Sequence, residues 1–393
     1  MKSLSVLDPN LLLEPSFHQG HDKYKLWEYM RENCPIYKHC HDDFPTFYSI
    51  TRYEDIKKVY QNHHLFSSKK GVLMRTLKQG EDPGSNLTLA LTDPPKHRQL
   101  RNIAKSWFSA SYVKSIESKV TEKIKSMLLA ASSDGGCDFT QDITSPLTLS
   151  ITCSILGVPE SEHLNVLKWC HDAFTNGVSL INNKDFMIFM GEFMEYKRLH
   201  PENDLASAII HGFIDDRNLT EREILLNFEN LIGATENASL SLSSGILALI
   251  QNEESMVLLK KERELIPLAI EEMLRWASSA SHSMRTVTED TVFGGVKFEV
   301  GSKVVLWLPS ANRDPEIFDQ PFFFNICRMP NNHIALGYGE HFCIGNILGK
   351  MQARVLLNEM LDSNIKLSLE SEPSFLSSIY VNGPEYFPVI VQR

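Results

Sequence analysis

The chain has 393 residues, a formal net charge of -10 and an isoelectric point near 5.8, which argue against nucleic acid as a main partner. No stretch approaches the ~20 consecutive apolar residues of a membrane span, so we expect a cytoplasmic protein without membrane contact. The seven cysteines are an odd number without CxxC spacing, which indicates reduced thiols rather than a disulfide framework.

Two strands are predicted near the N-terminus, over residues 35–38 and 46–50, because both runs are rich in β-branched and aromatic residues. The polar residues between them predict a hairpin turn. That turn begins at His39 with a His-Cys-His run, and these are residue types that bind metals. No second group of ligands lies nearby in the sequence, so we expect no metal site in the turn.

A helix is predicted over residues 93–108, with Asp93 as its N-cap and proline at its first position. His97, Arg101 and Lys105 follow one another at intervals of four residues and therefore share one face. A charged stripe of this kind is more often a solvated face than a binding site.

The longest predicted helix covers residues 219–250, and Thr220 and Glu223 have the spacing of a capping box at its start. A helix of about 30 residues is roughly 45 Å long, which is enough to cross a domain. Gly233 and Ala234 lie in its middle, where small side chains permit close approach of either a ligand or another helix. These two residues alone do not decide between those alternatives.

Cys343 lies in a glycine-rich segment over residues 336–345 that leads directly into a predicted helix over 346–361. Gly337 and Gly339 let the backbone adopt conformations that a side chain would block. A sulfur at a helix N-terminus gains from the partial positive charge there, which favours the thiolate that binds iron. The alternative is an inert buried cysteine, which is common in proteins.

The pattern Gly-x-Gly-x-His-x-Cys-x-Gly of residues 337–345 resembles the cysteine loop of the cytochrome P-450 superfamily. Other segments resemble landmarks of that family and recur in the expected order: 93–101 the haem-edge helix, 155–159, the Glu-x-x-Arg motif at 272–275, Arg285 with 289–290, 311–315, and 324–328. The resemblance runs from about residue 35 to the C-terminus, and so complete a set is not expected by chance.

The resemblance implies a mainly α fold with a small β region. The length exceeds the ~250 to 300 residues that one core usually fills, and by itself it would suggest two domains. From the resemblance we expect instead one domain over 1–393, with a β-rich lobe at approximately 35–65 and 277–330 and a helix-rich lobe in the remainder. We expect haem between the long central helix and the helix after the cysteine, in a monomeric protein.

The cofactor implied by the resemblance is haem b, iron protoporphyrin IX, with Cys343 as the iron ligand. The matching motif positions assign the haem contacts to His97, Arg101, Arg285, His333, His341, Gly233 and Ala234. Glu272 and Arg275 lie three residues apart on a helix predicted over 267–276, so they face the same side. In the family such a pair joins a further arginine, here Arg328, in a structural network that fixes the thiolate loop.

One position departs from the family pattern. The family usually has an acidic residue followed by threonine, and this chain has Glu236 followed by Asn237. We expect both to be catalytic, although an amide cannot relay a proton as the threonine hydroxyl does. Ser241 shares the face of Asn237 but lies one turn away. Either Asn237 holds a water that relays protons, or the substrate supplies a hydroxyl, or the reaction is not plain hydroxylation.

The substrate pocket is expected to draw on apolar residues before the haem-edge helix and in the lid helices, and on hydroxyl-rich residues after the Glu-x-x-Arg helix. By family position these are Leu73, Met74, Leu77, Phe174, Val178, Ser281, His282 and Ser283. An apolar pocket with several convergent polar groups suits a functionalised natural product, either free or attached to a carrier protein.

The resemblance implies a monooxygenase of secondary metabolism that uses dioxygen to oxidise a C–H bond of a small molecule. We expect electrons from a ferredoxin and its reductase, with Lys96, Arg98, Lys105 and Lys350 as candidates for the docking patch. Asn237 favours the alternative of a non-hydroxylating haem-thiolate enzyme, for desaturation, oxidative coupling or ring formation. A haem-binding sensor without catalysis is a third interpretation.

Overall fold

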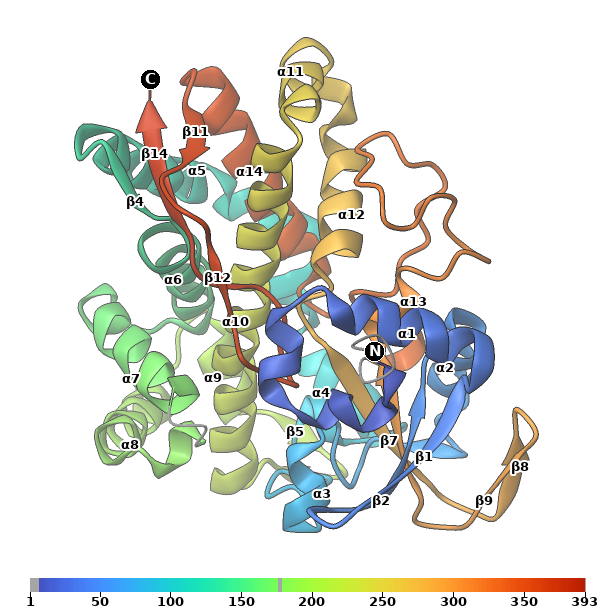
Figure 1. Ribbon diagram of the computed structural model, residues 1–393. Coiled ribbons are helices and arrows are strands. Elements are labelled where there is room, and N and C mark those ends of the chain that lie inside the picture. The colour runs from blue at the N-terminus through green and yellow to red at the C-terminus, as the bar shows by residue number, and fades with distance from the viewer. Residues whose placement is uncertain (1–6, 176–178, 393) are drawn as a thin grey trace.

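Helices form most of the computed structural model, which describes residues 7–175 and 179–392 (Figure 1). The α-helices are α1 (Asp22–Asn33), α2 (Tyr53–Gln61), α3 (Arg75–Gln79), α4 (Lys96–Ala104), α5 (Ala110–Ser133), α6 (Ser145–Leu156), α7 (His163–Thr175), α8 (Lys184–Leu199), α9 (Leu205–Ile210), α10 (Glu221–Gln251), α11 (Glu253–Lys261), α12 (Ile266–Ala277), α13 (Leu308–Ala311) and α14 (Asn346–Asp362). The expected mainly α fold with a small β region is confirmed.

The larger sheet has the strand order β1-β2-β10-β7-β3. Its strands are β1 (Ile36–His41), β2 (Phe44–Ile50), β3 (Phe66–Ser67), β7 (His282–Val287) and β10 (Lys303–Trp307). β1 and β2 form the predicted hairpin, whereas β10 runs parallel to β2 and antiparallel to β7. Val305 therefore lies between Ser49 and Met284, and the sheet joins the two chain segments that were predicted to be β-rich.

A second sheet, β11-β14-β4, was not predicted from the sequence. The remaining strands are β4 (Gly136–Asp138), β11 (Lys366–Leu369) and β14 (Pro388–Gln392), with the pairs β5 (Phe213–Ile214) and β6 (Arg217–Asn218), β8 (Thr291–Phe293) and β9 (Val296–Phe298), and β12 (Ser374–Phe375) and β13 (Pro384–Tyr386). The strands of the second sheet are three to five residues long, so they are too short for an alternating pattern to be recognised.

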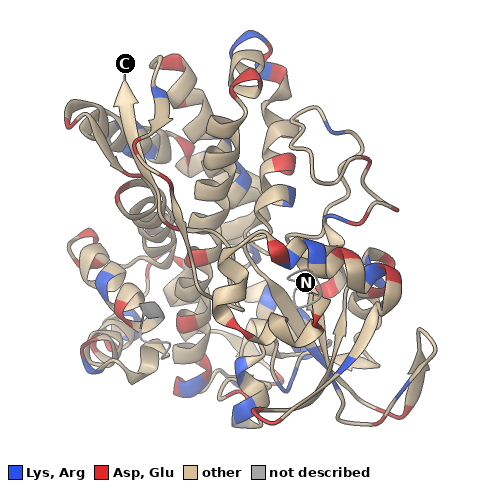
Figure 2. Ribbon diagram, viewed as in Figure 1, with Lys and Arg blue, Asp and Glu red and all other residues tan. Residues whose placement is uncertain are grey.

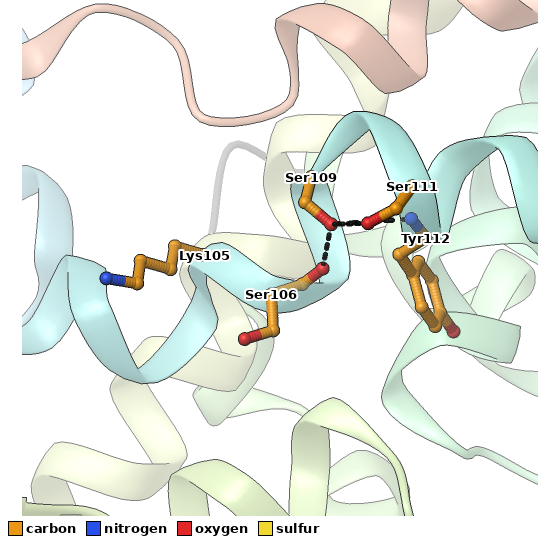
Figure 3. Close-up of a pocket in the computed structure, with 5 residues that line it drawn as sticks. All are labelled: Lys105, Ser106, Ser109, Ser111 and Tyr112. Carbon is orange, nitrogen blue, oxygen red and sulfur yellow. Dashed lines mark hydrogen bonds between the residues drawn. The ribbon is translucent and has the colours of Figure 1, made fainter.

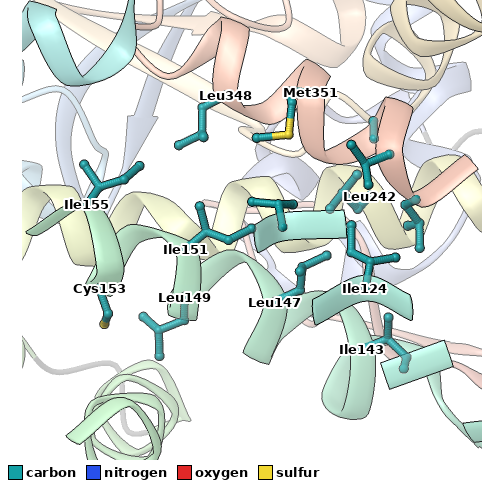
Figure 4. Close-up of a cluster of buried hydrophobic side chains, with 14 of the residues drawn as sticks. Ile124, Ile143, Leu147, Leu149, Ile151, Cys153, Ile155, Leu242, Leu348 and Met351 are labelled. Atoms are coloured by element: carbon teal, nitrogen blue, oxygen red, sulfur yellow. The ribbon is translucent and has the colours of Figure 1, made fainter. Parts of the chain in front are cut away.

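The main hydrophobic core lies where α5, α6, α10 and α14 meet. Ile151 of α6, Leu242 of α10 and Met351 of α14 are buried and point into the same space (Figure 4). Fully burying a side chain of this size contributes about 1.5–3 kcal/mol, so the cluster stabilises the packing of α10 on α6 and of α14 on α5. The helix α10 carries the Gly-Ala pair, and α14 follows the cysteine loop.

The capping box of α10 forms as predicted. Thr220 Oγ1 accepts a hydrogen bond from the backbone N–H of Glu223 at 3.2 Å, and Glu223 Oε2 accepts from the backbone N–H of Thr220 at 2.9 Å. Lys96 and Arg217 also bind the Glu223 carboxylate, at 3.1 Å and 2.7 Å. The Thr220 hydroxyl also donates to Oε2 at 3.0 Å, so four groups around one buried carboxylate fix the start of the long helix.

The predicted N-cap of the 93–108 helix is wrong. The Asp93 carboxylate accepts hydrogen bonds from Ser67 Oγ at 2.5 Å and from the backbone N–H of Ser68 at 2.9 Å, and α4 begins later, after Pro95. Partners distant in the sequence thus outcompete the local cap. The α-helix also ends at Ala104, and residues 105–108 continue as a 3-10 helix.

The structure shows a packing role for His39, the first residue of the His-Cys-His run. Its ring nitrogens lie 3.1 Å from Asn10 Oδ1 and 2.8 Å from Ser49 Oγ, and the ring stacks on Phe47.

Lysine, arginine, aspartate and glutamate are interspersed over the helices seen in Figure 2. Within residues 7–175 and 179–392, no helix is both long enough and apolar enough to cross a membrane.

Candidate functional site

The loop before α14 presents Cys343 ahead of the first helical turn. The backbone N–H of Cys343 donates to the carbonyl of Leu336 at 2.9 Å, and Asn346 Nδ2 donates to the carbonyl of Cys343 at 2.9 Å. Gly339 has φ +70°, and a Cβ at this position would lie 3.0 Å from the carbonyl oxygen of Tyr60. Glycine is therefore required at this turn, because any side chain would be both strained and crowded.

The Cys343 side chain is half-buried, and burial raises the pKa of its thiol. The backbone at Gly345 and the positive charge of Arg101 act in the opposite direction. A bound metal cation reverses this balance, because a thiol that coordinates a metal is deprotonated. A half-buried sulfur beside a cation and a helix N-terminus is thus a suitable metal ligand.

Two predicted histidines meet beside this loop. The rings of His97 on α4 and His341 lie 4.1 Å apart, and His341 Nε2 lies 3.2 Å from Ser68 Oγ. Burial lowers the pKa of His97 to about 4 and that of His341 to about 2, with Arg101 and Arg285 adding to these effects. Ser68 was not identified from the sequence, because its contact with His341 joins distant parts of the chain.

The two predicted arginines act on His341 and supply the positive charge of this cluster. Arg285 is buried, and its Nη1 donates to Ser283 Oγ at 2.7 Å and to the carbonyl of Met284 at 2.8 Å. Neither Arg101 nor Arg285 forms an ion pair with a carboxylate among the described residues, and His97 Nδ1 is buried without a hydrogen-bond partner. A ligand that carries carboxylates would satisfy these groups, and haem carries two propionates. The residues present therefore fit haem.

His333 does not join this cluster through any contact that the structure describes. Its Nε2 lies 3.0 Å from Glu271 Oε2, and its Nδ1 accepts from the backbone N–H of Ala335 at 3.3 Å. Lys350 of α14 binds the other oxygen of Glu271 at 2.7 Å. Both ring nitrogens of His333 are thus engaged by the protein, and its predicted propionate contact has no support in this geometry.

Glu272, Arg275 and Arg328 lie together and are buried. Arg275 Nε and Nη2 donate to the two carboxylate oxygens of Glu272 at 2.7 Å and 2.8 Å, and Arg328 Nε donates to Oε2 at 3.1 Å. The remaining guanidinium N–H groups donate to backbone carbonyls, including those of Asn312 and Asp319. A buried ion network is stable only when its polar atoms are satisfied in this way.

The middle of α10 presents an open face. Gly233 and Ala234 are exposed although α10 runs through the middle of the molecule (Figure 1), and no atom lies within 4 Å of a Cβ placed on Gly233. At roughly 100° per residue, Asn230 and Asn237 share this face. Asn230 is exposed, and Asn237 Oδ1 is buried without a partner. Asn230 was missed in the sequence, although its spacing from Asn237 could have identified it.

Glu236 occupies a different face of α10, toward Cys170 on α7. Glu236 is half-buried, and burial raises the pKa of its carboxyl group to about 7. No cation or hydrogen-bond donor binds the carboxyl group among the described residues. A carboxyl group with this pKa can both give and accept a proton near neutral pH.

Several predicted pocket residues are buried by protein instead of facing open space. His282 Nε2 accepts from the backbone N–H of Met74 at 3.0 Å, its Nδ1 lies 2.9 Å from the carbonyl of Ile379, and Met74 has no exposed surface. Leu77 and Ser281 are also buried. The His282 ring therefore links β7 to the residue before α3 and to the C-terminal segment.

The other pocket predictions have different outcomes. Leu73 is half-buried, and Ser283 is half-buried and bound to Arg285. Val178 lies outside the described residues, and Phe174 lies at the end of α7, where the structure describes the backbone but not the burial of the side chain.

Three of the four predicted docking cations are already paired. Lys96 binds Glu223, Arg98 binds Glu340 through two hydrogen bonds, and Lys350 binds Glu271. Lys105 forms no ion pair among the described residues. It borders a surface hollow of about 650 Å³ whose other lining residues are Ser106, Ser109, Ser111 and Tyr112 (Figure 3). This hollow is separate from the histidine, arginine and cysteine cluster.

Comparison with known proteins supports one family. A model of the family described as "Cytochrome P450" matches residues 194–375. The chain is 30% identical over 396 residues to "Cytochrome P450 NovI" of Streptomyces niveus, covering 98% of this chain and 97% of NovI. It is 29% identical to the "Steroid C26-monooxygenase" of Mycolicibacterium smegmatis, over 96% of this chain and 95% of that protein.

A solved structure shares the fold. P450BioI, crystallised in complex with an acyl carrier protein ligated to hexadec-9Z-enoic acid, superimposes with a TM-score of 0.84 and 25% sequence identity. The match covers 96% of this chain and 100% of that one. The two chains therefore share one fold over nearly their whole length.

Proposed function

Because the chain belongs to the cytochrome P450 family and is therefore a haem-dependent monooxygenase, we propose that it oxidises a C–H bond of a small natural-product-like molecule with Cys343 as the ligand of haem b iron. The observation that carries the proposal is the half-buried Cys343 in a cluster with two arginines and a histidine that lack anionic partners among the described residues. Sulfur, cations and an open helix face are the features that haem-thiolate chemistry needs.

In this proposal Cys343 binds the iron, and Arg101, Arg285, His97 and His341 bind the propionates. When bound, haem with a thiolate ligand supplies an oxidant strong enough for unactivated C–H bonds. The protein contributes orientation and proton control. Ser283 and the carbonyl of Met284 fix the direction of the Arg285 guanidinium, so a carboxylate would meet a preformed donor.

Proton supply is assigned to Glu236 and Asn237. Glu236 changes protonation state near pH 7, so in this proposal it gives and accepts protons on the face of α10 toward Cys170. Asn237 can orient a water or a substrate group, because its amide both donates and accepts hydrogen bonds. The two residues lie on different faces of α10, so a mobile water would have to connect them.

The proposed substrate carries polar groups. The open face of α10 places Asn230 on one side of Gly233 and Ala234, and Asn237 on the other. An apolar site with a few directed polar groups selects molecules by the position of their hydrogen-bonding groups. The substrate is either free or attached to a carrier protein, as the fatty acid in the P450BioI complex is.

Electrons come from a separate redox partner, which we propose to be a ferredoxin reduced by its reductase. The ion pairs of Lys96, Arg98 and Lys350 reduce the positive charge available for docking. Lys105 remains the best of the four predicted docking cations. We therefore expect substitution of Lys105 to slow electron transfer more than substitution of Lys350.

A second candidate is a non-hydroxylating oxidation, such as desaturation, oxidative coupling or ring formation. The observation that favours it is Asn237, which replaces a hydroxyl with an amide. An amide cannot relay a proton as a hydroxyl does, so the proton supply at this site differs from the pattern usual in the family.

Reconstitution with a ferredoxin, its reductase and dioxygen labelled with oxygen-18 tests the proposal against this second candidate. A panel of hydroxylated aromatic and polyketide-like compounds, plain fatty acids and steroids would be screened first for binding-induced changes in the haem spectrum. The proposal predicts a product that contains one labelled oxygen atom from a compound of the first group. A product that lacks two hydrogen atoms and the label supports the second candidate, and binding of plain fatty acids alone contradicts the proposed substrate class.

A further inference from the structure

Ser279 connects the segment after α12 to the middle of α10. Its hydroxyl donates to the backbone carbonyl of Asn237 at 2.9 Å and lies 2.7 Å from the hydroxyl of Ser241. The single hydroxyl proton of Ser279 is used on the carbonyl, so Ser241 is the donor in the second bond. A residue 42 positions away in the sequence is thereby tied to one turn of α10.

This contact acts on the helix itself. In an α-helix the carbonyl of Asn237 already accepts from the backbone N–H four residues later, which belongs to Ser241. A side chain that inserts into this ladder is a known cause of local helix bending. Ser279 cannot follow a movement of α10 freely, because its carbonyl accepts from the backbone N–H of Asn382 at 2.7 Å and Asn382 Nδ2 donates to the carbonyl of Ala277 at 2.8 Å.

The turn of α10 that Ser279 contacts carries the side-chain amide of Asn237, whose oxygen lacks a hydrogen-bond partner among the described residues. Asn237 Oδ1 is buried and forms no hydrogen bond, while the same helix face is open at Gly233. A buried amide oxygen without a partner costs free energy, so the fold must hold it in place by other contacts. Ser279 makes the side-chain contact at this turn, through the backbone carbonyl of Asn237, and Ser241 supports it by donating to the Ser279 hydroxyl.

We propose that Ser279, together with Ser241, is a positioning residue that holds the Asn237 amide toward a ligand on the open face of α10. The pair thereby takes over part of the task of the hydroxyl that family members usually have at position 237. The inference rests on the proposed function, because the ligand in question binds at haem iron.

The test uses the full-length holoprotein, reduced and bound to carbon monoxide, and measures the infrared stretching frequency of the C–O bond. The Asn237 amide can donate through its Nδ2–H group, and a hydrogen bond donated to the oxygen of carbon monoxide lowers this frequency. Asn237→Ala should therefore raise it, and Ser279→Ala should raise it by a smaller amount. The double variant should equal Asn237→Ala, because Ser279 acts only through that residue. Ser279→Thr keeps the hydroxyl and should restore the parent frequency.

Ser244→Ala is the matched control, since Ser244 lies on α10, is half-buried and forms no side-chain hydrogen bond among the described residues. Its frequency should equal that of the parent. Thermal unfolding identifies variants that fail to fold, and if Ser279→Ala is one of them, Ser241→Ala replaces it and should give a smaller shift in the same direction.

Two results would overturn the inference. A shift in Asn237→Ala with none in either serine variant shows that the serines do not position the amide. An unshifted Asn237→Ala shows that the amide does not reach the ligand. In both cases a parent protein with the red-shifted absorption band of a haem-thiolate retains the proposed function. A parent without that band rejects the proposed function and this inference together.

Discussion

Glu236 gives the clearest prediction for a single residue, because burial raises its pKa from 4.5 to about 7. The unfolded chain releases this proton above pH 4.5, but the folded protein keeps it until about pH 7. The group therefore costs no stability below pH 4.5, lowers stability progressively between these values, and imposes its full cost above pH 7. Glu236→Gln should remove that cost.

The measurement is the free energy of unfolding in urea between pH 4 and pH 8. The variant should gain stability relative to the parent as the pH rises, and the difference should level off above pH 7. Glu254→Gln is the control for the loss of one charge, because Glu254 is exposed on α11. A difference between Glu236→Gln and the parent that stays constant with pH would show that the carboxyl group is not held neutral by burial.

Two glycines on α10 lie in different surroundings, one on an open helix face and the other on a packed one. A Cβ on Gly233 meets no atom within 4 Å, whereas a Cβ on Gly245 would lie 2.4 Å from Met273 Cε. Both alanine variants gain the same helix propensity, about 1 kcal/mol. Gly233→Ala should therefore raise the free energy of unfolding. The free energy of unfolding of Gly245→Ala should be about 1–3 kcal/mol lower than that of Gly233→Ala, because the added methyl group overpacks the contact with Met273.

Equilibrium unfolding of the two variants side by side is the check. If Gly233→Ala were the less stable of the two, the middle of α10 would be covered by packed side chains, and the ligand-facing role of this segment would be lost.

The buried network between α12 and the segment before the cysteine loop supports a prediction about elements. Arg275 and Glu272 have no exposed side-chain surface. Arg275→Ala leaves a buried carboxylate partly unpaired and should cost about 3–5 kcal/mol. Arg354→Ala breaks an ion pair with Glu117 whose side chains are 38% and 17% exposed, and it should cost about 1 kcal/mol or less.

Chemical denaturation measures both costs, and haem content should fall only in Arg275→Ala, since only this residue supports the thiolate loop. Similar costs for both variants would mean that the buried network contributes no more than a surface ion pair.

Across the whole molecule, the features that depend on neighbouring residues in the sequence could be predicted from it. The glycine spacing around Cys343, the capping box at Thr220 and the length of α10 depend on neighbours within a few positions. Where a prediction from the sequence differs from the structure, a residue distant in the sequence supplies the hydrogen-bond partner. Asp93 binds Ser67 and Ser68 instead of capping α4, because the folded chain brings those donors to it.

The same reasoning explains which site residues were missed or placed differently. The ring of His333 lies within hydrogen-bond distance of Glu271, and the ring of His282 binds the backbone of Met74 and Ile379. No local sequence pattern predicts these partners. The contact between Ser279 and Asn237 spans 42 residues and joins two elements. Motif positions therefore identify which residues gather around the cysteine, but only the packed chain shows which atoms remain free to bind a ligand.

The most direct test of the central claim is the absorption spectrum of the dithionite-reduced protein under carbon monoxide, recorded for the parent, Cys343→Ala and Cys327→Ala. Cys327 is exposed, so its variant controls for the loss of a thiol. We predict a strongly red-shifted Soret band in the parent and in Cys327→Ala that disappears in Cys343→Ala. A band at the position typical of histidine-ligated haem in the parent, or no bound haem, would contradict the assignment of Cys343 and of the residues around it.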